Sequence, residues 1–274
     1  MKKIKLFFLL SLAVFFMVLS ACSSKDQSDK TLNDSAAADE FYNHLQDKGT
    51  IEVGSTPSGP PFTFLNTETN EIDGLMVDIS KSIGEKLDLD VNINSVNWVS
   101  LMPSLNGEKI DMIAAGMGIT EKRKEEIDFS QPVYSYGEAL VVLNGNDSIQ
   151  SIDDLQGKKI GVQEATLYYD ELIKESGINV QPYKTIQDMT KELINGRIDA
   201  YVADYPVYQM MLKELPDAKD KISAVPDYEP RYIVDLGLGI PKNTPEFQKA
   251  LNGAIDEMKQ SGELDKLIKK WELK

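Results

Sequence analysis

Apolar and polar positions follow one plan twice along this chain. Short apolar runs typical of strands alternate with segments whose apolar residues recur every three or four positions, as on one face of a helix. The first series occupies, in order, residues 50–55, 76–87, 91–96, 101–105 and 110–115. The apolar residues of its longer helix share one face, which suits a helix that covers a sheet: Met76, Ile79, Ile83 and Leu87. The β-α-β-α-β order predicts a parallel sheet with right-handed crossovers.

A second series repeats this plan at residues 159–162, 167–176, 178–183, 186–195 and 198–203. A helix at 205–214, a strand at 222–225 and two closing helices at 245–260 and 263–271 follow. Two extended segments, 134–143 and 232–240, flank the second series. The two series predict two similar α/β lobes. If both extended segments cross between these lobes, the closing helices return to the first lobe and the connection is a two-stranded hinge.

The N-terminus has the pattern of a secretory signal. Three lysines among the first five residues precede sixteen uncharged residues, a stretch too short for a comfortable membrane span. Residues 19–22 (LSAC) match the bacterial lipobox, in which the cysteine thiol is lipidated and the chain is cut just before it. We expect a signal peptide at 1–21, then a lipidated Cys22 and a flexible tether at 22–48. The alternative is a stray or buried cysteine; as the only one, Cys22 forms no intrachain disulfide.

The charge of the chain limits its partners. The formal net charge of the 274 residues is −15, and removal of residues 1–21 takes away three lysines and lowers it to −18. So acidic a surface argues against nucleic acid and against electrostatic docking on anionic lipid, which leaves acyl chains on Cys22 to hold the protein at the membrane. The only histidine, His44, has no second histidine or cysteine near it, so we expect no metal and no cofactor.

Residues 114–123 (AAGMGITEKR) stand out because they break a local rule. Thr120 is a good N-cap for a short helix, and Arg123 then falls at the third helical position, where a cation opposes the helix dipole by about 0.3–1 kcal/mol. The misplaced cation suggests that Arg123 is aimed at an anion. The alternative is an exposed arginine on a charged surface helix.

Several polar residues follow the predicted strands. Open parallel sheets bind ligands outside the carboxyl ends of their strands, where the chain changes direction between neighbouring strands. The loops at those ends cover residues 56–61, 97–98, 115–123, 164–168 and 203–206. A ligand site is therefore expected among these loops.

The order and spacing of many short motifs resemble a known family, the bacterial extracellular solute-binding proteins of the polar amino-acid ABC transporter type (family 3). The resemblance runs from Ile51 to Trp271. Its motifs lie at residues 54–64 (with Pro-Pro-Phe), 74–86, 101–112, 114–130, 152–162, 195–200, 204 and 262–271. The resemblance implies an α/β, two-lobed periplasmic-binding-protein-like fold (type II) with a two-stranded hinge. Lobe 1 would comprise 49–136 plus 238–274, and lobe 2 would comprise 137–237.

The resemblance also assigns the ends of the ligand. In that family the arginine at Arg123 binds the α-carboxylate and the aspartate at Asp204, on the other lobe, takes the α-ammonium. The carbonyl at Gly116 accepts from the ammonium as well. A guanidinium fork suits a planar carboxylate, and a carboxylate suits N–H donors. Holding one zwitterion from both lobes favours the closed state, which a membrane permease would read.

Further contacts to the carboxylate are expected from the chain around these anchors. Thr166 and Leu167 begin a predicted helix, so their free N–H groups form a second anion site facing Arg123. Gly118 occupies a position where relatives commonly carry a Ser or Thr hydroxyl. Without that hydroxyl, the carboxylate of the ligand would be bound by Arg123, Thr120 and backbone amides.

The side-chain end of the ligand is less well defined. Gly59 stands where relatives often have a stacking aromatic ring, and Trp98 either supplies that wall or packs in the core. Glu164 and Asp235 fall near the expected side-chain pocket. If both face it, a cationic side chain is favoured; otherwise they are solvated acids.

The sequence therefore predicts an extracytoplasmic, membrane-anchored lipoprotein, a monomer that binds an amino acid or similar small zwitterion for the permease and ATPase subunits of an ABC importer. No residue is predicted to be catalytic. Two alternatives stay open: a sensor module not coupled to transport, and an enzyme resembling cyclohexadienyl dehydratase on the same fold. Product formation distinguishes the enzyme, because hydrolysis or dehydration needs a placed acid-base group.

Overall fold

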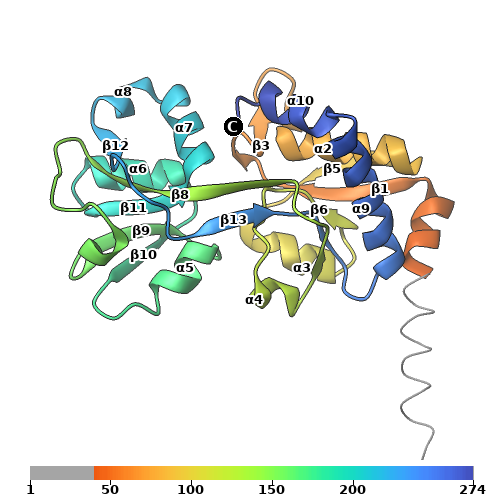
Figure 1. Ribbon diagram of the computed structural model, residues 1–274, viewed down its shortest axis with the longest axis horizontal. Coiled ribbons are helices and arrows are strands. Elements are labelled where there is room, and N and C mark those ends of the chain that lie inside the picture. The colour runs from red at the N-terminus through yellow and green to blue at the C-terminus, as the bar shows by residue number, and fades with distance from the viewer. Residues whose placement is uncertain (1–39, 274) are drawn as a thin grey trace, which may run out of the picture.

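The computed structural model describes residues 40–273, which form two lobes side by side (Figure 1). The predicted signal peptide and Cys22 lie outside the described residues. Residues 40–48, which the sequence assigns to the tether, form a helix. Its Leu45 is fully buried, and the rings of Phe41 and Tyr42 lie 5.5 and 5.8 Å from that of Phe247. A helix that packs on the first lobe thus precedes the first strand.

The first lobe contains a five-stranded sheet. Its order is β5 (Asp90–Ser95), β1 (Thr50–Ser55), β6 (Met112–Ile113), β14 (Gly239–Ile240) and β7 (Asp128–Phe129). Strands β5, β1 and β6 are parallel, but β14 runs antiparallel to both of its neighbours. The purely parallel sheet predicted from the strand–helix order is therefore wrong at this edge, because β14 returns from the second lobe.

Helices and a small hairpin sheet surround the first sheet. The small sheet consists of β2 (Ser58–Gly59), β3 (Thr63–Asn66) and β4 (Glu71–Asp73). The helices are α2 (Leu75–Leu87), η1 (Trp98–Ser100), α3 (Leu101–Asn106), α4 (Glu121–Lys124), α9 (Pro245–Gln260) and α10 (Glu263–Lys270). The apolar face of α2 is buried, and α9 and α10 pack beside it, so the closing helices belong to this lobe (Figure 1).

The second lobe has a sheet in the order β10 (Asn179–Tyr183), β9 (Lys159–Gln163), β11 (Ala200–Asp204), β8 (Tyr134–Leu143) and β12 (Ile222–Ala224). Strands β10, β9 and β11 are parallel, whereas β8 is antiparallel to β11 and β12. Its helices are η2 (Ile152–Leu155), α5 (Leu167–Leu172), α6 (Ile186–Ile194), α7 (Tyr205–Glu214) and α8 (Pro216–Lys219).

Two strands join the lobes. The first residues of β8 pair antiparallel with β13 (Ile233–Leu236), from Tyr134 opposite Leu236 to Gly137 opposite Ile233. The later residues of β8 belong to the second sheet, so one strand runs through the connection into the lobe (Figure 1). This arrangement confirms the predicted two-lobed fold with a two-stranded hinge. Among residues 40–273, every helix is too short or too polar to cross a membrane.

Candidate functional site

The predicted anchors come from opposite lobes and lie at strand ends. Arg123 is on α4, the short helix after β6, and Asp204 is the last residue of β11. Thr120 caps α4, since its hydroxyl accepts a hydrogen bond from the Arg123 backbone N–H at 3.2 Å. The predicted cap is thus confirmed.

The Arg123 guanidinium bridges the two lobes through main-chain carbonyls. Its Nη1 donates to the Gly118 carbonyl at 2.6 Å, and its Nη2 donates to the Ala165 carbonyl of the second lobe at 2.9 Å. The Trp98 indole N–H donates to the same Ala165 carbonyl at 3.3 Å, and Cζ of Arg123 lies 5.5 Å from the Trp98 ring centroid. Trp98 is half-buried, packs against the apolar cluster of the first lobe and lies at the lobe interface beside Arg123.

Two tyrosines hold Asp204. The Tyr168 hydroxyl donates to Oδ1 of Asp204 at 2.8 Å, and Tyr136 also hydrogen-bonds this carboxylate. Burial raises the pKa of Asp204, while the two tyrosine hydrogen bonds and the charge of Arg123 oppose the rise. Burial and the Asp204 charge raise the pKa values of Tyr136 and Tyr168 well above the usual value for tyrosine, so both phenols stay neutral donors.

Arg123 and Asp204 are close enough to influence each other without pairing. Within residues 40–273, Arg123 forms no ion pair within 4.0 Å, but Asp204 contributes to its electrostatic environment, as do Tyr136, Asp170 and Tyr168. Burial lowers the pKa of Arg123, and these groups counteract that effect. An arginine remains protonated at any ordinary pH, so the site holds one positive and one negative charge apart.

Aromatic side chains form a wall beside Asp204, to which Phe62 of the Pro-Pro-Phe motif contributes together with Tyr134 and Tyr136, which the sequence did not single out. The rings of Phe62 and Tyr136 are stacked, with centroids 5.3 Å apart, and Tyr134 lies 6.0 Å from Phe62. Gly116 packs against this wall with φ 67°, and a Cβ there would lie 3.0 Å from Phe62 Cβ. The detectable signal was the alternation of Tyr134 and Tyr136 on one face of an extended segment.

The neighbours of the two unusual glycines differ. A Cβ at Gly118 would lie 2.6 Å from Cγ1 of Val234, so Val234 fills the space that a Ser or Thr side chain would need. A Cβ at Gly59 would meet nothing closer than 3.6 Å, so the backbone there leaves room for a side chain. A hydroxyl-bearing side chain at Gly118 would thus require Val234 of β13 to move.

The remaining predicted residues are distributed around the interface. Thr166 caps α5, accepting from the Tyr169 N–H at 3.2 Å, and Leu167 is the first residue of that helix. Asp235 is exposed on β13 and accepts a 2.5 Å hydrogen bond from Ser135. Glu164 is partly buried, and its backbone N–H donates to the Tyr183 carbonyl at 2.9 Å.

Ion pairs also join the lobes. Lys122 of α4 donates to both carboxylate oxygens of Asp170 on α5, at 2.8 Å each. Lys213 of α7 pairs with Glu272, which follows α10 in the first lobe. The lobes are therefore in direct polar contact beside the site and near the C-terminus.

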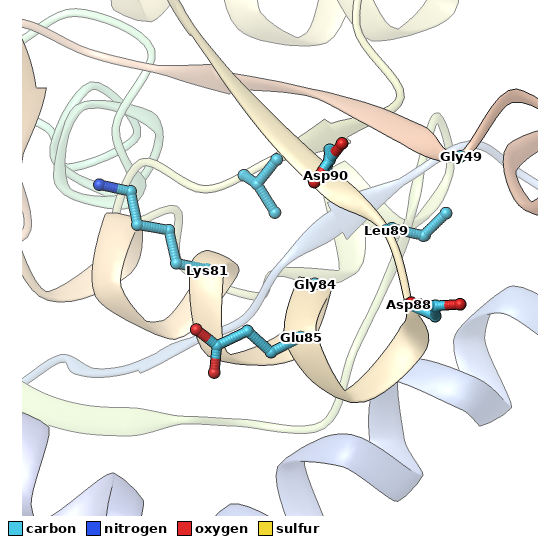
Figure 2. Close-up of a pocket in the computed structure, with 8 residues that line it drawn as sticks. Gly49, Lys81, Gly84, Glu85, Asp88, Leu89 and Asp90 are labelled. Carbon is cyan, nitrogen blue, oxygen red and sulfur yellow. The ribbon is translucent and has the colours of Figure 1, made fainter.

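The open spaces in the molecule differ in place and size. A cavity of about 20 Å³ lies beside Asp204, lined entirely by the second lobe. A groove of about 660 Å³ separates the β2–β3–β4 hairpin from Gln187 and Glu214 of the second lobe. A depression of about 500 Å³ lies entirely on the first lobe. Figure 2 shows the residues that line it, mostly from the C-terminal half of α2 and from the start of β5. Residues 40–273 contain no cluster of three or more His, Cys, Asp or Glu side chains that could hold a metal.

Two α/β lobes, a hinge of two strands and opposite charges from the two lobes define a two-lobed binding protein. The family model of bacterial extracellular solute-binding proteins, family 3, matches residues 51–274, and the chain belongs to this family. A probable histidine-binding protein of Campylobacter jejuni is 32% identical over 274 residues, covering all of both chains. A putative ABC transporter arginine-binding protein of Escherichia coli is 30% identical over 226 residues, 81% of this chain and 90% of that protein.

Solved structures agree with the family. An ancestral arginine-binding protein bound to glutamine superposes with a TM-score of 0.74 at 36% identity, covering 81% of this chain and 97% of that one. At this identity the likeness extends beyond the fold to the family's function. The chain is accordingly a solute-binding protein.

Proposed function

We propose that this protein captures an amino acid between its lobes, outside the cytoplasm, and delivers it to the permease and ATPase subunits of an ABC importer. Arg123 binds the α-carboxylate and Asp204 the α-ammonium. The Gly116 carbonyl, Thr120 and the N–H groups at Thr166 and Leu167 add contacts. The relatives named for binding histidine and arginine support an amino-acid ligand.

The observation that carries the proposal is the pair of opposite charges contributed by separate lobes. Arg123 and Asp204 act on each other but form no ion pair, and their other polar contacts are neutral carbonyl and phenol groups. A zwitterion placed between them would give each charge a partner. Charge-assisted hydrogen bonds of this kind contribute about 1.5–3 kcal/mol each.

Entry of the ligand requires the lobes to separate. The cavity beside Asp204, about 20 Å³, holds one water molecule but not an amino acid, and Arg123 donates across the interface to Ala165. Residues 49–136 with 238–274 move as one body and residues 137–237 as the other, with β8 and β13 as the hinge. The ligand then closes the lobes because only the closed form offers both anchors.

Lipidation of Cys22 keeps the protein at the outer face of the cell membrane, and the mature chain acts as a monomer. The lipobox at residues 19–22 and the acidic surface support this arrangement. A sensor without a transporter would bind the same ligand. Genes for a permease and an ATPase beside this one, together with loss of uptake when it is deleted, distinguish an importer from a sensor.

A thermal-shift screen against the standard amino acids tests the proposal. A ligand at a hundred times its Kd stabilises the native state by about 2.7 kcal/mol, which raises the melting temperature measurably. Calorimetry and product analysis on the responding ligand follow. No shift with any amino acid overturns the proposal, and turnover of the ligand identifies an enzyme instead.

A further inference from the structure

We infer that the amino acid held at this site carries an uncharged side chain. This inference rests on the proposed function and specifies its substrate class. It differs from the expectation, raised by the sequence, that Glu164 and Asp235 favour a cationic side chain. The argument depends on which charges face the site and which of them already have partners.

The charges of the site balance those of a zwitterion. Arg123 supplies one positive charge and Asp204 one negative charge, and the phenols beside them are neutral. An amino acid with a neutral side chain matches this pair one to one. A third charge on the ligand would be removed from water at the lobe interface without a partner, which is costly.

The other carboxylates near the anchors are already satisfied. Both oxygens of Asp170 accept from Lys122 at 2.8 Å. Glu138 is buried at the end of the hinge, where one oxygen accepts from the Tyr228 hydroxyl at 2.5 Å and the Arg231 N–H at 2.7 Å. Its other oxygen accepts from the Tyr232 N–H at 2.9 Å. Neither acid is free to pair with an ammonium or guanidinium group of a ligand.

Asp235 points away from the anchors. Tyr136 and Val234 are cross-strand partners in the hinge, so their side chains share one face, and this face meets Asp204 and Gly118. Successive side chains of a strand alternate in direction, so Asp235 and its partner Ser135 lie on the opposite face. The hinge thus directs an aromatic and an aliphatic side chain toward the ligand and the acid away from it.

Glu164 is the remaining acid on the loop that approaches the site. The carboxylates that act most strongly on Arg123 are those of Asp170 and Asp204, not that of Glu164. The residues of this loop that line the cavity at Asp204 are Gln163 and Thr166, on either side of it. Glu164 is therefore the carboxylate whose replacement tests most directly whether an acid pairs with the ligand side chain.

Aromatic rings do not replace the missing carboxylate. Cζ of Arg123 lies 5.5 Å from the centroid of the Trp98 ring, so the guanidinium charge repels a second cation at that ring. The faces of Phe62 and Tyr136 are stacked on each other at 5.3 Å. A ligand with an anionic side chain would also lack a partner. Lys122 is the other cation of α4 that contacts the second lobe, and it is already paired with Asp170.

The test uses pairs of ligands with similar side-chain shape and different side-chain charge: citrulline and arginine, norleucine and lysine, glutamine and glutamate. Isothermal titration calorimetry on the full chain should give at least about tenfold tighter binding for the neutral member of each pair, a difference of about 1.4 kcal/mol. Glu164→Gln and Asp235→Asn should leave these ratios unchanged. These variants keep shape and remove charge.

The outcomes separate this inference from the proposed function. Arginine, lysine or glutamate binding as tightly as its neutral counterpart overturns the inference and leaves amino-acid binding in place. Loss of tight arginine binding in Glu164→Gln would further identify Glu164 as the partner of the cation. Binding of no pair member and no standard amino acid overturns both.

Discussion

At the scale of single residues, the site depends on side chains that meet far from their places in the sequence. Tyr168 and Asp204 are 36 positions apart, and Arg123 and Ala165 are 42 apart. The guanidinium of Arg123 and the carboxylate of Asp204 are each hydrogen-bonded to neutral groups, carbonyls and a phenol respectively. Predictions at this scale concern those two charges.

Replacement of Arg123 by alanine should reduce amino-acid affinity by about a hundredfold or more. The change removes at least two charge-assisted hydrogen bonds to the α-carboxylate, each contributing about 1.5–3 kcal/mol. Calorimetry with the ligand found by thermal shift measures the loss. Arg197→Ala, which removes an exposed arginine paired with Glu192, is the matched control and should bind normally. Unchanged affinity in Arg123→Ala would remove this residue from the site.

As the pH is lowered, ligand affinity should begin to fall at a pH above 3.8, the usual pKa of an aspartate. Burial raises the pKa of Asp204, so its carboxylate takes up a proton earlier than an exposed one and can no longer pair with the ammonium. The groups that face it are Arg123 on α4, Tyr136 on β8 and Tyr168 on α5, and all three keep their charge state over this range.

The raised pKa of Asp204 makes ligand affinity increase with pH, but it makes the stability of the free protein decrease with pH. Between pH 3.8 and the raised pKa the folded state binds more protons at Asp204 than the unfolded state, so this group's contribution to stability declines as pH rises. Calorimetry across pH measures the affinity, and denaturant unfolding measures the stability. Asp204→Asn should bind weakly with no dependence on pH in this window; a wild-type pH profile in that variant would contradict the assignment.

At the scale of elements, α4 and α5 face each other across the lobe interface, and β8 with β13 set how they meet. The Lys122–Asp170 pair spans this interface without belonging to the anchors. It stabilises the closed arrangement and should affect ligand affinity indirectly, because binding and closure are coupled.

Lys122→Ala should weaken ligand binding by no more than about fivefold. The lysine side chain is 68% exposed and that of Asp170 27%, so the pair contributes about 0–1 kcal/mol after solvent screening. Added salt should shrink the difference from wild type. Lys124→Ala, which removes a neighbouring lysine paired with Glu121 inside the same helix, is the control. Equal effects of both variants would show that general charge, not the lobe contact, is responsible.

At the scale of the whole molecule, two lobes share a connection of two strands, and the polar contacts between them lie beside the site and near the C-terminus. Connections of this kind permit hinge motion, since few main-chain torsions need to change. The large groove between the hairpin and the second lobe shows that the lobes do not meet over their full facing surfaces.

Small-angle X-ray scattering should show a smaller radius of gyration when saturating ligand is added. Ligand shifts the hinge equilibrium toward the closed form, in which the two lobes pack against each other. Arg123→Ala at the same ligand concentration should not contract. A wild-type protein whose scattering is unchanged by a tightly bound ligand would contradict hinge closure.

Much of the architecture could be read from local patterns. The strand at Thr50–Ser55, the extended segment Tyr134–Leu143 and the helix Pro245–Gln260 were predicted to the residue. Periodicity succeeds there because each segment buries one continuous face. It failed for the two-residue strand β7, it merged β13 and β14 into one extended segment, and it made β6 too long, because such short pairings depend on neighbours rather than on their own residues.

What the sequence by itself determined is most of the elements and the family, because these follow from periodicity and ordered motifs; the roles of Arg123 and Asp204 as anchors stay a prediction. Only the tertiary structure decided the antiparallel return of β14, the tyrosines on Asp204, and the turn of Asp235 away from the site. These features come from contacts between segments far apart in the chain, such as the 36 positions between Tyr168 and Asp204 and the 100 between Ser135 and Asp235. The physical reason is that register and facing are fixed by long-range contacts, which no local pattern records.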